Sequence, residues 1–168
     1  NWTPFDPAGA KQVVNKWIIG ETQRTVEVVT RELEAYRFHE AAGALYKFVW
    51  NVFCDWYIEL IKPLLAGEDE AALAETRCAA AWTLEQIVRL LHPFMPFITE
   101  ELWRRLGEFG PKRETMLIVE QWPNLPATLA DEKAADEIGW VIELVSQTRS
   151  ARAELNVPAG AKIPLLLL

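Results

Sequence analysis

The sequence contains few residues that could build a redox, metal or membrane site. Cys54 and Cys78 are its two cysteines, and they lie far apart and in no CxxC pair, so we interpret them as buried thiols in a reducing cytoplasm. Its two histidines, His39 and His92, have no second ligand at helical spacing, so we expect no metal site. No apolar run approaches the roughly 20 residues that a membrane span needs, and the first residues lack the pattern of a signal peptide.

The net charge argues against a nonspecific nucleic-acid binder, and the lack of a catalytic constellation argues against an enzyme. Taken alone, the net charge of −7 opposes nonspecific binding to nucleic acid, DNA included, because such binding depends on neutralising phosphates. Asp55 and Glu59 could form a carboxylate pair for acid–base chemistry. However, no nucleophile, oxyanion donor or phosphate-binding glycine loop accompanies them. We therefore expect no catalytic residue and no bound cofactor in these 168 residues.

The apolar residues indicate one globular core built from helices. Hydrophobic residues make up 51% of the chain, and eight of them are tryptophans. Apolar positions recur at helical spacing in five segments. We therefore expect an all-α fold, a bundle of about five helices with a short extended or β appendage at the C-terminus. The expected helices cover residues 9–36, 38–61, 70–91, a segment beginning at Pro96, and 131–154.

Two prolines divide what would otherwise read as one long helix. Pro93 and Pro96 interrupt the run "LHPFMPFITEELW", and Pro96 suits the first turn of a new helix, where its missing N–H costs nothing. Spacing then predicts which residues face the core. For the third helix they are Leu73, Ala80, Leu84, Ile87 and Leu91; for the fourth, Ile98, Leu102 and Leu106; for the fifth, Ile138, Val141, Ile142 and Val145.

Two segments near the C-terminal side suggest extended structure. "TMLIVEQW", residues 115–122, is punctuated by prolines and glycines on both sides and predicts a short strand or an extended segment. "AKIPLLLL", residues 161–168, predicts a terminal strand. Because four leucines end the chain, we expect it to be cut from a longer polypeptide whose next strand is missing.

The second expected helix is apolar over more than half of its circumference. At about 100° per residue, one face carries Phe38, Ala42, Leu45, Val49, Val52, Phe53, Trp56 and Leu60, and Tyr46, Trp50, Tyr57 and Ile61 widen it. A helix of this kind lies at the centre of a bundle or against another domain. The narrow remaining strip carries Asn51, Asp55 and Glu59 at spacing i, i+4, i+8. It is either a solvated face or a strip that reads base edges by hydrogen bonds.

Three segments of the chain resemble a known family. "FVWNVFCDWYIELIKP" (48–63), "LHPFMPFITEELW" (91–103) and "RSARAELNVPAGAKIPLLL" (149–167) are similar to the anticodon-binding domain of bacterial valyl-tRNA synthetases, which are class I enzymes. The proline-rich segment is shared with the isoleucine and leucine enzymes, whereas the first segment is more specific to the valine family. The chain departs from the family at His39 and Val52. It also lacks the His-x-Gly-His and Lys-Met-Ser-Lys-Ser signatures of ATP binding.

The resemblance implies that the chain grips the anticodon arm of a valine-accepting tRNA. The ATP- and Mg-dependent aminoacylation would belong to catalytic domains outside this chain, which, with the editing domain, would be its protein partners. Residues 1–130 would form the anticodon-binding bundle, and 131–168 the last helix and the truncated start of the next region. Candidate tRNA contacts are Arg37, Phe38, Asn51, Asp55 and Glu59. Lys16, Arg24 and Lys47 are candidates for phosphates, and Phe38 or Trp56 for stacking unless these two rings are core.

Two alternatives remain open at this point. The chain could be a helical bundle for protein interaction, a role that its acidic balance favours. It could also be the corresponding module of an isoleucyl- or leucyl-tRNA synthetase.

Overall fold

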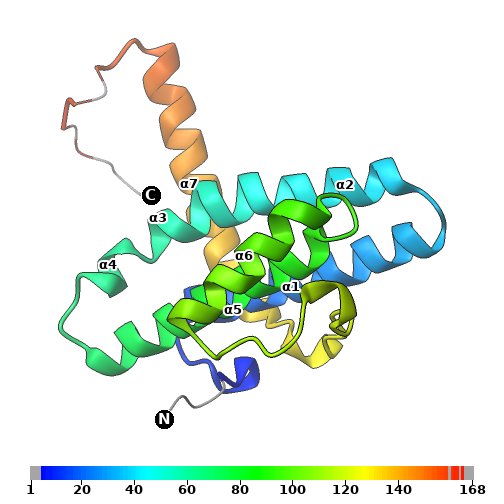
Figure 1. The fold of residues 1–168 in the computed structure, drawn as a ribbon. Helices are drawn as coiled ribbons and strands as arrows, with labels where there is room; N and C mark the ends of the chain where they lie inside the picture. The colour runs from blue at the N-terminus through cyan, green and yellow to red at the C-terminus, as the bar shows by residue number, and fades with distance from the viewer. Residues whose placement is uncertain (1–4, 159, 163, 165–168) are drawn as a thin grey trace.

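The structure, a computed structural model, describes residues 5–158, 160–162 and 164, and in that part of the chain it is an all-helical bundle without strands (Figure 1). Its long helices match the five predicted ones. The α-helices are α1 (Val13–Glu34), α2 (Phe38–Lys47), α3 (Ile58–Leu60), α4 (Lys62–Leu65), α5 (Glu70–Leu91), α6 (Pro96–Phe109) and α7 (Glu132–Glu154). A π-helix, η2 (Phe48–Tyr57), joins α2 to α3, and three 3₁₀ turns complete the fold: η1 (Pro7–Gly9), η3 (Leu117–Val119) and η4 (Ala127–Leu129).

The central helix of the bundle is α1, not the second helix that the sequence predicts. Helix α1 packs against α2, η2, α5 and α7. It is buried on several faces at once, so that Asn15, Thr22 and Gln23 are buried together with Ile18 and Val29. The hydrophobic arc of the second helix is wider in its sequence, but α1 has neighbours on more sides.

A buried polar cluster joins three helices at the start of α1. Glu75 of α5 accepts hydrogen bonds from the backbone N–H groups of Lys11 and Gln12, at 3.0 and 2.9 Å, and so caps α1 from another helix. Asn15 donates to Glu75 at 3.0 Å and accepts from the hydroxyl of Tyr57 in η2 at 3.0 Å. Burial, helped by the negative charge of Glu75, raises the pKa of Tyr57, so the phenol stays protonated and donates. These hydrogen bonds fix the position of α1 along its axis relative to η2 and α5.

The second helix runs as one rod through α2, η2 and α3, as the sequence predicts, but its middle part is not α-helical. In η2 the N–H of Ile58 donates to the carbonyl of Phe53, five residues back. The fully packed positions along the rod are Ala41, Leu45, Phe48, Phe53, Tyr57 and Ile61. Their spacing widens to five residues between Phe48 and Phe53, which turns the rest of the rod relative to an α-helix.

The break between α5 and α6 confirms the interpretation of the two prolines, but the predicted core face of α6 is wrong. Helix α6 begins at Pro96. Its buried residues are Thr99 and Trp103, whereas Ile98 and Leu102 are exposed. In α5, Leu84 is likewise exposed, because the buried face runs through Ala79, Thr83, Gln86, Ile87 and Leu90. The predicted α5 stripe is otherwise confirmed, since Ile87 is buried and Ala80 and Leu91 pack against the core, and in α6 only Leu106 of the predicted stripe packs, partly buried.

The segment after α6 is held by Trp103. The indole donates to the carbonyl of Thr115 at 3.1 Å and lies against two guanidinium groups, those of Arg89 at 4.8 Å and Arg113 at 3.9 Å from the ring centre. Residues 115–122 form the turn η3 between extended residues, so the extended alternative is confirmed and the strand is not formed.

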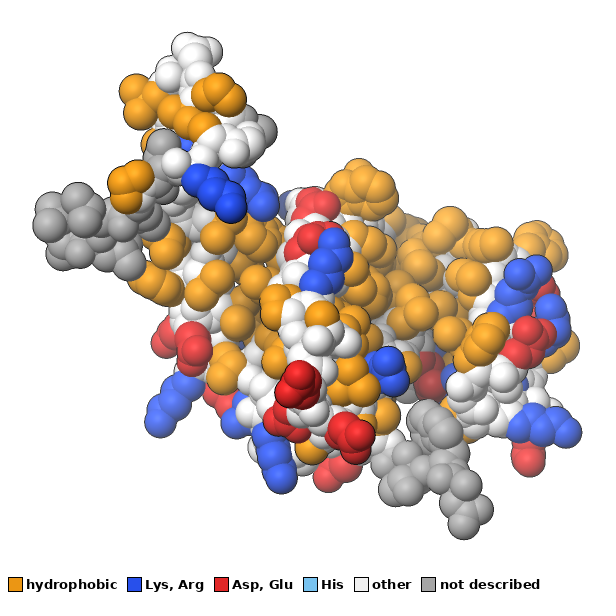
Figure 2. All heavy atoms as spheres, turned by 90° about the vertical axis from the view of Figure 1, so that its left-hand side faces the viewer, with side chains coloured by type: hydrophobic (Ala, Val, Ile, Leu, Met, Phe, Trp, Pro, Cys, Tyr) orange, Lys and Arg blue, Asp and Glu red, His pale blue; other side chains and the backbone are white. Residues whose placement is uncertain are grey.

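Helix α7 begins in the core and ends outside it. Asp131 accepts from the N–H of Ala134 at 3.0 Å, and this bond, with Lys16 nearby, lowers the pKa of Asp131. Ala134 and Ile138 pack in the core beside α1, whereas the last turns leave the bundle and project at the top of Figures 1 and 2. Val141, Ile142 and Val145 are only half-buried. The predicted terminal strand, residues 161–168, falls mostly outside the described residues.

Candidate nucleic-acid interface

The sharp corner between α1 and α2 presents aromatic side chains to solvent. Helix α1 ends in a Schellman motif, in which Tyr36 N–H donates to the carbonyl of Leu33 at 3.0 Å and Arg37 N–H to that of Glu32 at 2.8 Å. Tyr36 takes the left-handed position of this motif, with φ of 57°, although glycine or asparagine usually occupies it. Helix α7 closes with the same motif but uses Asn156 (φ 53°). A bulky aromatic residue at this position therefore stands out.

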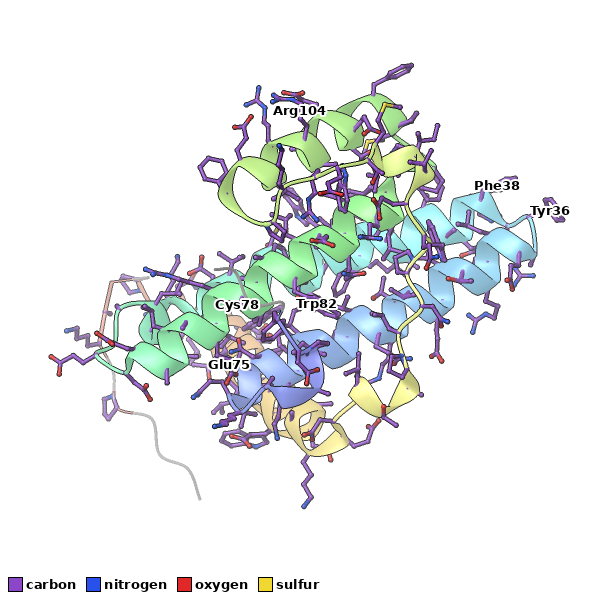
Figure 3. The ribbon with its side chains drawn as sticks, turned by 60° about the horizontal axis from the view of Figure 1, so that its bottom comes forward. Tyr36, Phe38, Glu75, Cys78, Trp82 and Arg104 are labelled. Carbon is purple, nitrogen blue, oxygen red and sulfur yellow. The ribbon has the colours of Figure 1, made fainter. Side chains whose placement is uncertain are left out.

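Tyr36 and Phe38 lie at this corner and point away from the bundle (Figure 3). Tyr36 is 81% exposed, and its ring meets that of Phe38 edge to face at a centroid distance of 6.3 Å. Phe38 is itself exposed, so the alternative in which Phe38 is a core residue is wrong. Two rings in this position are available to stack on unpaired bases.

Arg37 is held at the corner by an ion pair. Its Nε donates to Glu32 Oε2 at 2.5 Å, while Arg31 contacts the other oxygen at 2.9 Å. These hydrogen bonds, that from Arg37 first, lower the pKa of Glu32, so the carboxylate is ionised at neutral pH. About half of the Arg37 side chain remains exposed. Part of the guanidinium can therefore meet a ligand while the ion pair fixes its direction.

The polar strip of the second helix faces solvent, as its spacing predicts. Asn51, Asp55 and Glu59 are all exposed. Glu59 pairs with Lys62 at 2.6 Å. No hydrogen bond or ion pair with a described side chain occupies Asn51 or Asp55. These two side chains keep their hydrogen-bonding groups for water or a ligand.

Sequence reasoning missed two aromatic residues on this side of the rod. Tyr46 and Trp50, expected in the apolar arc, are 65% and 56% exposed. Their rings stack, with an interplanar angle of 10° and centroids 6.5 Å apart. Cys54, expected as a buried thiol, is also exposed. Trp56, by contrast, packs against the core and carries the guanidinium of Arg149 over its ring at 5.6 Å.

Two of the three cations expected to meet phosphates already have acidic partners, whereas the third, Lys47, is exposed. Lys16 pairs with Asp131 at 3.3 Å. Arg24 pairs with Glu21 at 2.6 Å and with Glu132 at 3.0 Å. These contacts tie α1 to the beginning of α7. These ion pairs give Lys16 and Arg24 a structural role, which is to connect α1 with α7. Neither residue belongs to the corner or to the polar strip.

The candidate residues form an extended face and not a pocket. From Phe38 to Glu59 the rod spans about 30 Å at roughly 1.5 Å per residue.

Within the described residues no group of three His, Cys, Asp or Glu side chains could hold a metal ion, and no helix is long and apolar enough to cross a membrane.

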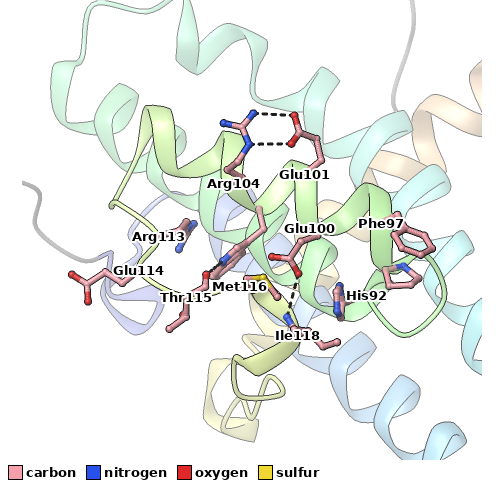
Figure 4. A pocket seen from close by; sticks show the side chains of 12 residues that line it. His92, Phe97, Glu100, Glu101, Arg104, Arg113, Glu114, Thr115, Met116 and Ile118 are labelled. Atoms are coloured by element: carbon pink, nitrogen blue, oxygen red, sulfur yellow. Dashed lines mark hydrogen bonds and ion pairs between the residues drawn. The ribbon is translucent and has the colours of Figure 1, made fainter.

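A groove of about 670 Å³ lies elsewhere, between α6 and the segment after it (Figure 4). Two of its three acidic side chains, Glu100 and Glu101, are engaged in internal contacts. Glu100 accepts from the backbone N–H of Leu117 at 2.8 Å, and Glu101 pairs with Arg104 at 3.0 Å. Arg104 and then Arg105 lower the pKa of Glu101 to about 2. We therefore place the candidate interface on the rod and the corner.

Comparison with known proteins points to one family. A family model described as the anticodon-binding domain of tRNA ligase matches residues 15–167. Over 98% of its length the chain is 62% identical to a valine–tRNA ligase of Caulobacter vibrioides and 52% identical to one of Brucella suis. A valine–tRNA ligase of Rhizobium meliloti is also 52% identical over the same share. The chain spans only 17–18% of the length of these relatives.

Proposed function

The chain belongs to the family of anticodon-binding domains of tRNA ligases, and from this premise we propose that it binds the anticodon arm of a valine-accepting tRNA. The arm would be positioned for aminoacylation by other domains of a valine–tRNA ligase. The chain itself contributes no catalytic residue, and the ATP-binding signatures are absent from its 168 residues. We propose a cytoplasmic location, as for a translation enzyme.

The observation that supports this function best is the exposed face along the second helix. It combines stacking groups at the corner with hydrogen-bonding groups, Asn51 and Asp55, that no described side chain occupies. Single-stranded loops are read by stacking on aromatic rings and by hydrogen bonds to base edges. Arg37 and Lys47, which are both exposed, add positive charge to a protein of net charge −7.

The proposal of valine specificity rests on the relatives. Those of 52–62% identity are named valine–tRNA ligases, which favours the valine enzyme over the isoleucine and leucine alternatives. The individual base contacts of Arg37, Phe38, Asn51, Asp55 and Glu59 remain proposals. For Lys16 and Arg24 a phosphate contact would have to compete with their ion pairs to α7.

The remaining domains of the ligase, which would supply ATP and Mg chemistry, are proposed protein partners. The face of α6 and η3 suits such a contact, since Phe97 is 92% exposed and Ile98, Ile118 and Val119 are exposed beside it. The family match disfavours the alternative that the bundle serves protein interaction alone.

The test is a titration of the chain at low salt with valine tRNA and with the same tRNA carrying an altered anticodon. Tighter binding of the unaltered tRNA is expected. Asp55→Asn and Asn51→Ala should reduce this preference, whereas Glu137→Gln, at an exposed site on α7, should not. Equal binding of both tRNAs would contradict anticodon reading, and absence of binding at any salt would favour the interaction bundle.

A further inference from the structure

Tyr46 and Trp50 form an exposed, stacked pair of aromatic rings on the rod. Trp50 is 56% exposed and Tyr46 is 65% exposed. Neither belongs to a core cluster among the described residues, and the two rings lie nearly parallel against each other. Exposed aromatic side chains cost solvation free energy that burial would recover. Two of them side by side on a helix therefore suggest a ligand with a flat apolar face.

Trp50 lies on the side of the rod that faces away from the packed positions. Phe48 is buried, and two residues turn a helix by roughly 200°, so the residue two positions further on is directed toward solvent. Beyond it, Tyr57 is buried and Trp56 packs partly buried against the core. Trp50 and Asn51 lie in the π segment, which begins at Phe48, and both are exposed.

The π-helix is a second sign of a functional surface. Wide helices of this type are rare, occur mostly as short bulges inside α-helices, and are frequent at functional sites. This one lasts ten residues and lies in the segment that presents Trp50, Asn51 and Asp55.

The groups around the pair favour a nucleic-acid base over an apolar protein surface. Asn51 follows Trp50 directly, and Lys47 follows Tyr46; both are exposed. An amide can hydrogen-bond to a base edge, and a lysine can pair with the adjoining phosphate. A stacking ring, an edge-reading amide and a cation within one and a half helical turns form a combination typical of single-strand recognition.

We propose that an unpaired base of the anticodon loop stacks on the indole of Trp50, with the Tyr46 ring supporting the indole from behind and Asn51 reading the base edge. This inference rests on the proposed function, because it names a further contact of the same face. It places a stacking site about 18 Å from Phe38 along the rod, at roughly 1.5 Å per residue. The loop would then be held at two separate points, the corner and the middle of the rod.

The experiment is a binding titration with an RNA hairpin of the valine anticodon stem and loop, using the whole 168-residue chain. Trp50→Ala should weaken binding about 5-fold to 150-fold, the effect of losing one stacked base, and Trp50→Phe should restore most of it. Trp140→Ala is the matched control, since this residue is exposed to a similar degree on α7. Circular dichroism of each variant would verify that the helical content is retained.

A fluorescent adenine analogue placed in turn at each loop position gives a second readout. Stacking on Trp50 should quench the analogue at one position with the unmodified chain, and the quenching should disappear with Trp50→Ala. If the unmodified chain binds the hairpin and Trp50→Ala binds it equally well, this inference is wrong and the proposed function stands. If the unmodified chain does not bind the hairpin, the proposed function fails and takes this inference with it.

Discussion

Replacement of Tyr36 by glycine should stabilise the bundle relative to replacement by alanine. Tyr36 adopts φ of 57° at the end of α1. This left-handed conformation costs an L-residue about 1–2 kcal/mol, because its Cβ crowds the following carbonyl oxygen. Glycine avoids the clash but loses about 0.5–1 kcal/mol more conformational free energy on folding. The difference leaves Tyr36→Gly more stable than Tyr36→Ala by about 0.5–1 kcal/mol.

The comparison between two variants isolates the backbone contribution. Both remove the ring and with it the edge-to-face contact with Phe38, so that loss cancels. Urea unfolding followed by circular dichroism would give the two free energies, with equal slopes showing that the same surface is exposed. Ala35→Gly is the control, since Ala35 has φ of −84° and gains nothing from glycine. It should be destabilised by about 0.5–1 kcal/mol.

The reasoning would be refuted if Tyr36→Gly were no more stable than Tyr36→Ala. A related readout concerns binding. If the exposed Tyr36 ring stacks on a base, both variants should bind the anticodon hairpin more weakly, including the glycine variant that is the more stable of the two. The gain in stability of the glycine variant over the alanine variant would then bring no gain in affinity, as expected where a strained residue is retained for function.

Three further predictions concern the structure around the site. Tyr57→Phe should destabilise the bundle by about 1–3 kcal/mol in urea unfolding, because it leaves the buried oxygen of Asn15 without its donor. Glu32→Gln should reduce the loss of unfolding free energy that the unmodified chain shows as the pH falls below 4.5. The folded-state pKa of Glu32 is below its ordinary value of 4.5, so its contribution is fully present above pH 4.5 and lost as pH falls through the lower pKa. Trp103→Leu should make residues 111–121 sensitive to limited proteolysis. The segment would lose the hydrogen bond from the indole to Thr115, and Arg113 would lose the ring that it packs against.

Each of these has a matched control. Tyr46→Phe removes an exposed hydroxyl and should leave stability unchanged. Glu34→Gln, at an exposed site of the same helix, should retain the acid dependence of the unmodified chain. Trp140→Leu should not increase cleavage after α6. A large effect of any control would show that the corresponding prediction reflects a general loss of stability.

The sequence predicts the helices well because their ends are locally encoded. Asp69 caps α5 through the N–H groups of Ala71 and Ala72, and Pro96 begins α6, so short-range chemistry is sufficient at both places. The orientation of each helix is harder. In α6 the choice between a face with Ile98 and a face with Thr99 and Trp103 depends on neighbours that periodicity does not reveal.

The candidate site shows the same division. The exposure of Asn51, Asp55 and Glu59 follows from spacing, since these are the polar positions of a mostly apolar helix. The exposure of Tyr46 and Trp50 was missed because both are apolar residues at the margin of a wide arc, and periodicity does not show how much of that arc the neighbouring helices cover. The α7 partners of Lys16 and Arg24, Asp131 and Glu132, lie more than a hundred residues away in sequence, and only the fold brings them together.

The wide step between Phe48 and Phe53 also bears on how this chain can change in length. Removing one residue from an α-helix turns everything beyond the deletion by about 100°, so core residues move to solvent. Between Phe48 and Phe53 the rod holds one residue more than an α-helix would use to connect the same buried positions. A deletion of Asn51 should therefore leave a folded bundle with η2 converted to α-helix, whereas a deletion of Ala44 should unfold it. The rod could then lose a residue within its candidate interface and keep its core, so that a deletion there would alter the exposed surface before it alters the fold.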